Sequence, residues 1–231
     1  MRDTISLEKY IYEEIIPKYS GFDPAHQEDH ALTVIRQAEK LMEGRDAWLD
    51  GQESAEEIWK SPIDRDMLLT AAACHDLGLT NGRERHHLDS GIIIRNDERL
   101  REWFNEEEIE TIAEAAEDHR ASGKTAPRSI YGMIVAEADR VIEAETIIRR
   151  TVQFGFKNYP GLDKEGHISR VIEHLHEKYG RNGYLKLWIP WSDNAVRLAA
   201  LQDIIADEKA VYQEVRRIYR SLHELNGTGT K

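Results

Sequence analysis

The chain has 231 residues, of which 40% are hydrophobic, so it is long enough to bury one large core or two small ones. Its 31 Lys and Arg against 43 Asp and Glu give a formal net charge of -12, which repels polymeric polyanions such as DNA. No segment approaches the roughly 18 apolar residues of a membrane helix, and the start MRDTISLEKY lacks the apolar stretch of a signal peptide. These features predict a cytoplasmic protein with neither a nucleic-acid polymer nor a membrane as partner.

Helical periodicity dominates the chain, and alternating strands between tight turns are missing, which predicts an all-α fold. Asn105 and Glu108 match a capping box. Residues 45–62 are polar and are expected to hold at most one short helix. In chain order, the expected helices cover residues 4–19, 25–43, 64–77, 86–96, 105–120, 129–154, 165–179 and 192–225.

The third of these helices raises a question about function. It contains MLLTAAACHDL, which is apolar nearly all round, as in a central helix, and Gly78 is expected to cap it. The helix nevertheless ends on His75 and Asp76, whose burial without partners costs several kcal/mol. One His-Asp dipeptide is expected by chance, so its meaning depends on the rest of the chain. Cys74 beside it is interpreted as a small core residue, and as the only cysteine it excludes an internal disulfide.

Other His and Asp residues share the core-facing side of their expected helices. His30 lies at the edge of the apolar stripe of its helix, His119 continues such a stripe, and Asp139 lies within the apolar helix IYGMIVAEADRVI. Alone, each would be explained by ordinary packing or solvation. Together they suggest a metal site, because helices of a bundle build such sites from inward-facing side chains. The mixed His and Asp donors suit Fe, Mn, Co, Ni or Zn.

In this order the residues resemble a known family. His30 in HALTV, His75-Asp76 in CHDLG and Asp139 in EADRV resemble the H…HD…D pattern of the HD-domain metal-dependent phosphohydrolases, in particular the compact bacterial members. The resemblance covers about residues 20–160 and extends weakly into EHLHEKY and the last helix. It implies an HD-domain helical bundle with additional C-terminal helices. We therefore expect a single HD-type domain over residues 1–231, with the metal-binding core at about 20–160 and a helical extension at about 165–225.

The resemblance also implies the ligands. Some family members hold two metal ions and add two histidines between the HD pair and the last aspartate, and His87 and His119 occupy those places. His87 fits the H-x-x-x-G form of its position better than His86, which is assigned to solvent or to the surroundings of the ligands. Two ions are favoured over one, with Asp76 as the bridge. The predicted divalent-metal ligands are His30, His75, Asp76, His87, His119 and Asp139.

The chain departs from the family at two points. Many relatives carry DADRLDA around the last aspartate, where this chain has EADRVIE, so Glu137 and Glu143 are the acidic neighbours of Asp139. DHRASGKTAP replaces the HHExxDGxGYP element of the members that degrade cyclic dinucleotides, so that activity is disfavoured.

The implied activity is hydrolysis of a small phosphorylated metabolite, with a nucleotide preferred, by attack of metal-bound hydroxide on phosphorus. Asp76 and His26 are the predicted catalytic residues, and Arg83, Arg85 and Lys124, which closely follow the ligands in sequence, are predicted to bind substrate. Two alternatives stay open: a mixed-valent di-iron oxygenase, as found on some HD folds, and a non-catalytic HD module that senses a ligand. The long last helix would pack internally or form a homodimer.

Overall fold

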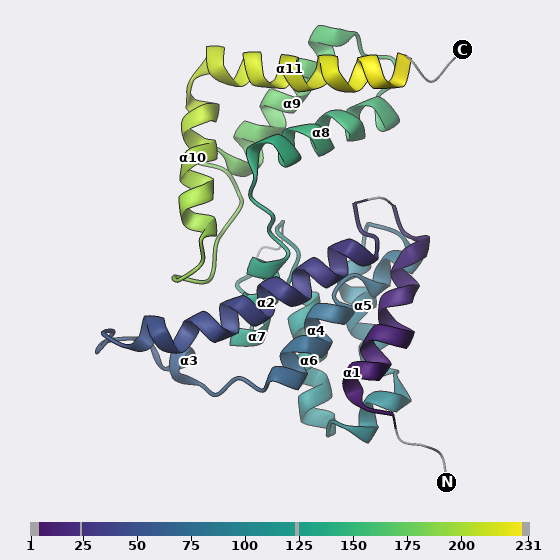
Figure 1. Cartoon of the computed structure of the whole chain (residues 1–231), viewed down its shortest axis with the longest axis vertical. Coiled ribbons are helices and arrows are strands. Elements are labelled where there is room, and N and C mark those ends of the chain that lie inside the picture. The colour runs from purple at the N-terminus through teal and green to yellow at the C-terminus, as the bar shows by residue number, and fades with distance from the viewer. Residues whose placement is uncertain (1–4, 24, 123–124, 228–231) are drawn as a thin grey trace. The chain divides into compact units, whose positions relative to one another are not determined.

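The computed structural model describes residues 5–23, 25–122 and 125–227, the last three by their backbone only. Every regular element in these residues is a helix (Figure 1), which confirms the all-α prediction. None of the described helices is both long and apolar enough to cross a membrane. The chain forms two compact units. The N-terminal unit is Met1–Arg140 with Trp188–Ser192, and the C-terminal unit is Val141–Leu187 with Asp193–Lys231.

The N-terminal unit is a bundle around α4 (Arg65–Cys74). The residues of α4 from Met67 to Cys74 are all buried, as expected for a central helix, and Cys74 is a buried free thiol. The expected first helix is divided into α1, a π-helix (Ile11–Ile15) and a 3-10 helix (Ile16–Gly21). Two more 3-10 helices cover Leu77–Asn81 and Glu98–Glu102. The α-helices of this unit are α1 (Leu7–Tyr10), α2 (Glu28–Leu49), α3 (Glu57–Lys60), α4 (Arg65–Cys74), α5 (His86–Arg95), α6 (Glu106–Glu117) and α7 (Ile130–Ala138).

Local side-chain caps explain where several of these helices begin. The Asp64 carboxylate accepts the backbone N–H groups of Asp66 and Met67 at the start of α4. The predicted capping box of Asn105 and Glu108 is confirmed at the start of α6. These contacts satisfy backbone donors that have no partner within the helix, and so determine at which residue α4 and α6 begin.

Gly78 has a different role from the predicted helix cap. It lies in the 3-10 helix after α4, and the described glycines with positive φ are Gly51 and Gly82. A β-carbon at residue 78 would lie 2.0 Å from the carbonyl oxygen of His86 and 2.6 Å from the backbone nitrogen of Ser90. The Gly78 N–H also donates to Ser90 Oγ at 2.9 Å. A glycine is therefore needed here so that the first turn of α5 can pack directly against the end of α4.

Two long helices expected from the sequence are interrupted. The helix expected at 129–154 ends at Ala138 and resumes as α8 (Ala144–Asn158), although neither Gly nor Pro marks the break. The helix expected at 192–225 is divided into α10 (Asn194–Ala206) and α11 (Glu208–Gly227). At the second break, the Asp207 carboxylate accepts the N–H groups of Lys209 and Ala210 and so caps α11.

The C-terminal unit consists of α8, α9 (Lys164–Tyr179), α10 and α11 (Figure 1). It has its own hydrophobic core, whose fully buried members include Ile148, Val152, Val171, Leu175, Val215 and Ile218.

The segment Trp188–Ser192 returns to the N-terminal unit and is held there by specific contacts. The Glu137 carboxylate, 1% exposed, accepts the Trp188 backbone N–H at 2.8 Å. Trp191 Nε1 donates to the Leu41 carbonyl at 2.7 Å, and its ring packs against Trp48. The last turn of α7, which precedes Asp139, is therefore attached to a segment about 50 residues further along the chain.

Candidate metal centre

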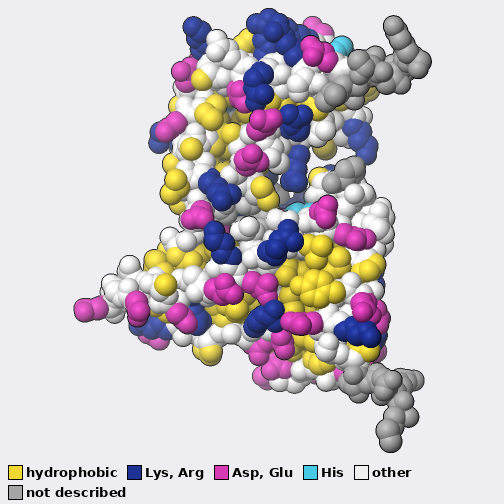
Figure 2. All heavy atoms as spheres, viewed as in Figure 1, with side chains coloured by type: hydrophobic (Ala, Val, Ile, Leu, Met, Phe, Trp, Pro, Cys, Tyr) yellow, Lys and Arg dark blue, Asp and Glu magenta, His cyan; other side chains and the backbone are white. Residues whose placement is uncertain are grey.

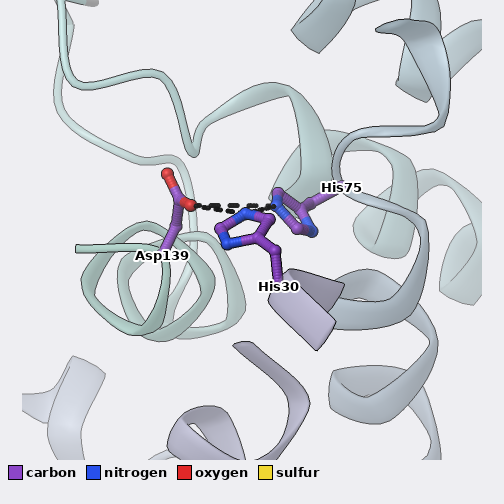
Figure 3. A group of neighbouring side chains, drawn as sticks. All are labelled: His30, His75 and Asp139. Carbon is purple, nitrogen blue, oxygen red and sulfur yellow. Dashed lines mark hydrogen bonds and ion pairs between the residues drawn. The ribbon is translucent and has the colours of Figure 1, made fainter. Parts of the chain in front are cut away.

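Six side chains of the N-terminal unit form two adjacent groups that could each hold a metal ion. In each group, the three potential ligand atoms lie within 4.8 Å of one another. The first group is His30, His75 and Asp139, which come from α2 and from the ends of α4 and α7 and point toward one another in Figure 3. The second group is Asp76, His86 and His119. We call these six residues the His/Asp cluster.

The first group is tightly packed. His30 Nε2 lies 3.2 Å from Asp139 Oδ1 and 3.3 Å from His75 Nε2, and His75 Nε2 lies 3.8 Å from Asp139 Oδ1. The His75 side chain is fully buried, whereas Asp139 is 26% exposed. Asp139 is therefore the side of this group that faces solvent.

Asp76 joins the two groups through its two carboxylate oxygens. Its Oδ2 lies 3.3 Å from His75 Nε2 and 3.6 Å from His30 Nε2. Its Oδ1 lies 3.4 Å from His119 Nε2 and 3.5 Å from His86 Nε2. With one oxygen directed at each group, Asp76 has the geometry of a carboxylate that bridges two cations.

Backbone hydrogen bonds orient three of the four histidines. The Nδ1 atoms of His75, His86 and His119 lie 2.8, 2.8 and 2.5 Å from the carbonyl oxygens of Ala72, Arg83 and Ala116. A carbonyl requires the proton on Nδ1, so the Nε2 lone pair of each neutral ring is directed into the cluster. His86 Nε2 and His119 Nε2 are only 3.1 Å apart. Two lone pairs at this distance need a cation between them or a proton on one ring.

Contacts between the histidines and the carboxylates also shift the pKa values of the cluster residues. Burial favours neutral His30, but hydrogen bonds to Asp139 and Asp76 outweigh burial and raise the pKa of His30 to about 9. Burial also opposes ionisation of Asp76, yet the charge of His75 and hydrogen bonds from His119 and His30 hold its pKa well below the ordinary value. His119 behaves like His30, because its hydrogen bond to Asp76 raises its pKa against burial. Protons on these rings thus balance the carboxylates when no metal is bound.

We therefore predict that metal binding releases protons. At pH 7.5 His30, with a pKa near 9, is mostly protonated, and it must lose this proton before Nε2 can bind a metal ion. At least one proton per chain should leave at pH 7.5, and the number should fall as the pH rises through about 9. Isothermal titration calorimetry of the metal-free protein in buffers with different ionisation enthalpies measures this number. A value of zero at pH 7.5 would contradict the expected charge state.

Tyr19, the last residue of the first expected helix, positions Asp76. The ring is fully buried, and its hydroxyl donates to the Ala73 carbonyl at 2.8 Å and accepts the Asp76 backbone N–H at 3.2 Å. The hydroxyl thus holds the turn at the end of α4 on which His75 and Asp76 lie.

Tyr19→Phe should lower metal affinity about tenfold, in the range found when partners of metal ligands are removed. It should also reduce the free energy of unfolding by about 1–3 kcal/mol, because the Asp76 N–H loses its acceptor. Tyr131→Phe is a matched control, since Tyr131 Oη accepts the Asp64 N–H at 2.8 Å at the opposite end of α4. Metal titrations and chemical denaturation of both variants test this. Equal losses of metal affinity in the two variants would show that Tyr19 acts through general stability.

The structure brings together five of the six predicted ligands and replaces the sixth. His86, not the predicted His87, is the histidine whose ring nitrogen lies with the potential ligand atoms of Asp76 and His119. His86 is the first residue of α5, and its Nδ1 contact with Arg83 O turns the ring toward His119. His87 points away from the cluster, toward Arg120 Nη1 at 3.5 Å, and lines a neighbouring cleft of about 360 Å³. Burial and the Arg120 charge lower the pKa of His87 to about 4.

His26 and Arg83 lie together beside the cluster. The His26 ring meets the His30 ring edge to face at 5.5 Å, and its Nδ1 lies 3.0 Å from Asp23 Oδ1. Arg83 Nη1 lies 3.4 Å from Asp23 Oδ2, and Arg83 Nη2 lies 3.3 Å from His26 Nε2. Asp23 thus holds both residues, a role that the sequence analysis missed because Asp23 lies in a loop outside any periodic pattern.

Of the other two predicted substrate-binding residues, the structure describes only Arg85. Arg85 is exposed at the residue before α5, and within the described part of the chain no hydrogen bond or ion pair links it to the cluster. Lys124 lies outside the described residues.

The donor set of the cluster fits divalent transition metals. Four imidazole nitrogens and two carboxylates are ligands that Fe, Mn, Co, Ni and Zn accept, whereas Mg and Ca prefer sites made of oxygen alone. Three of the histidines are also held in position by backbone carbonyls, as the histidine ligands of metal sites usually are. The Asp76 carboxylate is shared between the two groups.

Comparison with protein families gives a match to the family described as HD domain, over residues 28–144. This range covers just over half of the chain and contains all six residues of the cluster. No curated protein and no solved structure matches the chain significantly.

Proposed function

The chain belongs to the HD-domain family of metal-dependent hydrolases, and from this premise we propose that it is a phosphohydrolase with a binuclear metal site. The observation that carries the proposal is Asp76, whose two oxygens face separate groups of ligand atoms. One ion would be held by His30, His75 and Asp139, the other by His86 and His119, and Asp76 would be shared. A divalent ion at such a site lowers the pKa of bound water towards ~7 and offsets the charge of a phosphoryl group.

His26 and Arg83 are the proposed phosphate-binding residues. Arg83 is 59% exposed, so its guanidinium is accessible to an incoming anion while Asp23 fixes one edge of it. His26 touches the His30 ring, which brings a hydrogen-bonding ring next to the ligands without making it one of them. Together they would hold a phosphate group beside the first ligand group, whose most exposed member is Asp139.

The substrate class we propose is a small phosphorylated metabolite, with nucleotides as the first candidates. The net charge of -12 disfavours long polyanions, but one arginine and a metal site are sufficient for a single phosphate group. His26 and Arg83, held in place by Asp23, would contact the phosphate group and not the rest of the substrate, so we expect activity on more than one phosphate ester.

The test begins with elemental analysis of the purified protein. The protein is then reloaded with Fe, Mn, Co, Ni or Zn and assayed for phosphate release from nucleotides, sugar phosphates and a chromogenic phosphodiester. Phosphate release that requires the metal and is lost in His75→Ala supports the proposal. Stoichiometric metal without hydrolysis of any of these compounds would contradict it.

The same set of six ligands also suits two iron ions, as an oxygenase would require. Oxygen consumption by the iron-loaded protein, with phosphonates and polyols as substrates, distinguishes the two activities. Hydrolysis supported by Mn or Co, without oxygen consumption, would favour the phosphohydrolase.

A further inference from the structure

The C-terminal unit has an arginine-rich cleft on α11 that is separate from the His/Asp cluster. The cleft has a volume of about 410 Å³ and is lined by Gln213, Arg216, Arg217, Arg220, Ser221 and Glu224. We call it the α11 cleft. Arg216 and Arg220 are four residues apart and thus lie on the same side of the helix. Figure 2 shows Lys and Arg side chains gathered over α11.

This concentration of arginine contrasts with the charge of the whole chain. The C-terminal unit has 14 Lys and Arg against 12 Asp and Glu, whereas the rest of the chain has 17 against 31. The net negative charge of the protein therefore comes from the N-terminal unit alone. The overall charge of -12 therefore does not predict the electrostatic potential at α11, where the arginines attract an approaching anion.

The arginines of the cleft differ in how they are neutralised. Arg217 is paired with Glu214 at 2.6 Å and with Glu145 at 3.3 Å, so acidic side chains already hold its guanidinium. Arg216, in contrast, has a buried Nε without a hydrogen-bond partner among the described residues. A buried donor without a partner is costly, and in native proteins such groups commonly meet water or a ligand. Arg220 is exposed one turn further along the same side.

We propose that the α11 cleft binds the polyphosphate group of a small molecule, held by Arg216 and Arg220. Guanidinium groups match phosphate oxygens with two parallel hydrogen bonds, and two such groups one turn apart suit more than one phosphate. Gln213 and Ser221 add neutral donors, while Glu224 limits the anionic part of the ligand to the Arg216 side of the cleft. The acidic N-terminal unit disfavours long nucleic acids, so the ligand is a compact polyanion.

Titration calorimetry with inorganic tripolyphosphate tests the proposal on the full chain. Because tripolyphosphate binds metal ions, the titration is done on the protein as purified and again in the presence of excess EDTA. Binding in the α11 cleft should persist with EDTA, weaken with added salt, and become at least tenfold weaker in the double variant Arg216→Gln/Arg220→Gln.

The double variant Arg181→Gln/Arg197→Gln is the matched control. It removes the same charge from two exposed arginines of the C-terminal unit outside the cleft, and it should bind as the unchanged protein does. Arg220→Gln alone, at an exposed position, provides the same test if the variant at partly buried Arg216 folds poorly. Absence of tripolyphosphate binding, equal weakening in both double variants, or tighter binding of a single-stranded oligonucleotide than of tripolyphosphate would each overturn the proposal.

Discussion

Asp76→Asn is expected to remove metal from both halves of the His/Asp cluster. Asp76 is 2% exposed, and each of its oxygens lies within 3.6 Å of the Nε2 atoms of one ligand group. An amide keeps the shape of the side chain but offers one neutral acceptor oxygen, so it cannot supply a negative charge to both groups. Metal content should fall below about a tenth of that of the unchanged protein, and the rate of phosphate release should fall by more than about a hundredfold. This loss is larger than the roughly 10–100-fold loss expected when only a hydrogen-bond partner of a ligand is removed.

Asp66→Asn provides the control for this experiment. Asp66 lies in the first turn of α4, at the opposite end of the helix from His75 and Asp76, and its carboxylate is 57% exposed. Plasma emission spectrometry measures metal content, and circular dichroism confirms that both variants fold. Asp76→Asn protein that retains two ions per chain would show that the bridge is not a ligand.

His86→Ala and His87→Ala are expected to differ sharply, although the two residues are adjacent. His86 Nε2 lies 3.1 Å from His119 Nε2 and 3.5 Å from Asp76 Oδ1, whereas His87 contacts Arg120 outside the cluster. His86→Ala should therefore lose one of two metal ions and more than about a hundredfold in activity. His87→Ala should keep both ions and stay within about threefold of the activity of the unchanged protein.

Metal content and initial rates of the two variants, measured side by side, decide this prediction. The reverse result, with metal lost from His87→Ala and retained in His86→Ala, would restore the choice made from the H-x-x-x-G spacing. Loss of one ion in both variants would mean that α5 as a whole, and not one ring, positions the second site.

Helical phase, together with the resemblance to the H…HD…D pattern, predicted five of the six residues that the structure brings together in the cluster. His30 and His119 lie within long amphipathic patterns, so the neighbouring apolar residues indicate which way each side chain points. His86 and His87 lie at the start of α5, so no preceding helical turn shows which side of the helix faces the core. If the start of the helix shifts by one residue, His87 faces inward in place of His86. The packing of Gly78 against the His86 carbonyl determines which of the two histidines faces inward. This contact joins two separate segments of the chain, and the periodicity of a single helix carries no information about it.

The interruptions of the helices were predictable to different degrees. Asp207 is a typical N-cap residue, and its position before Glu208 is a local signal that the apolar stripe of the last helix concealed. The end of α7 at Ala138 has no comparable signal, since neither Gly nor Pro lies between Ala138 and the start of α8. Asp139 there interacts with His30 on α2, and such tertiary contacts override local propensity.

The attachment of Trp188–Ser192 has a practical consequence for anyone who dissects this chain. The family match ends at residue 144 and the first unit breaks at Arg140, so a fragment of residues 1–140 would be the obvious minimal metalloprotein. That fragment would remove the Trp188 N–H from Glu137, two residues before Asp139, and the Trp191 ring from the aromatic group at the end of α2. A design that replaces residues 141–187 with a short linker, and retains Trp188–Ser192, keeps the helix under Asp139 intact. A minimal fragment designed around the His/Asp cluster therefore has to combine two segments that are separate in sequence.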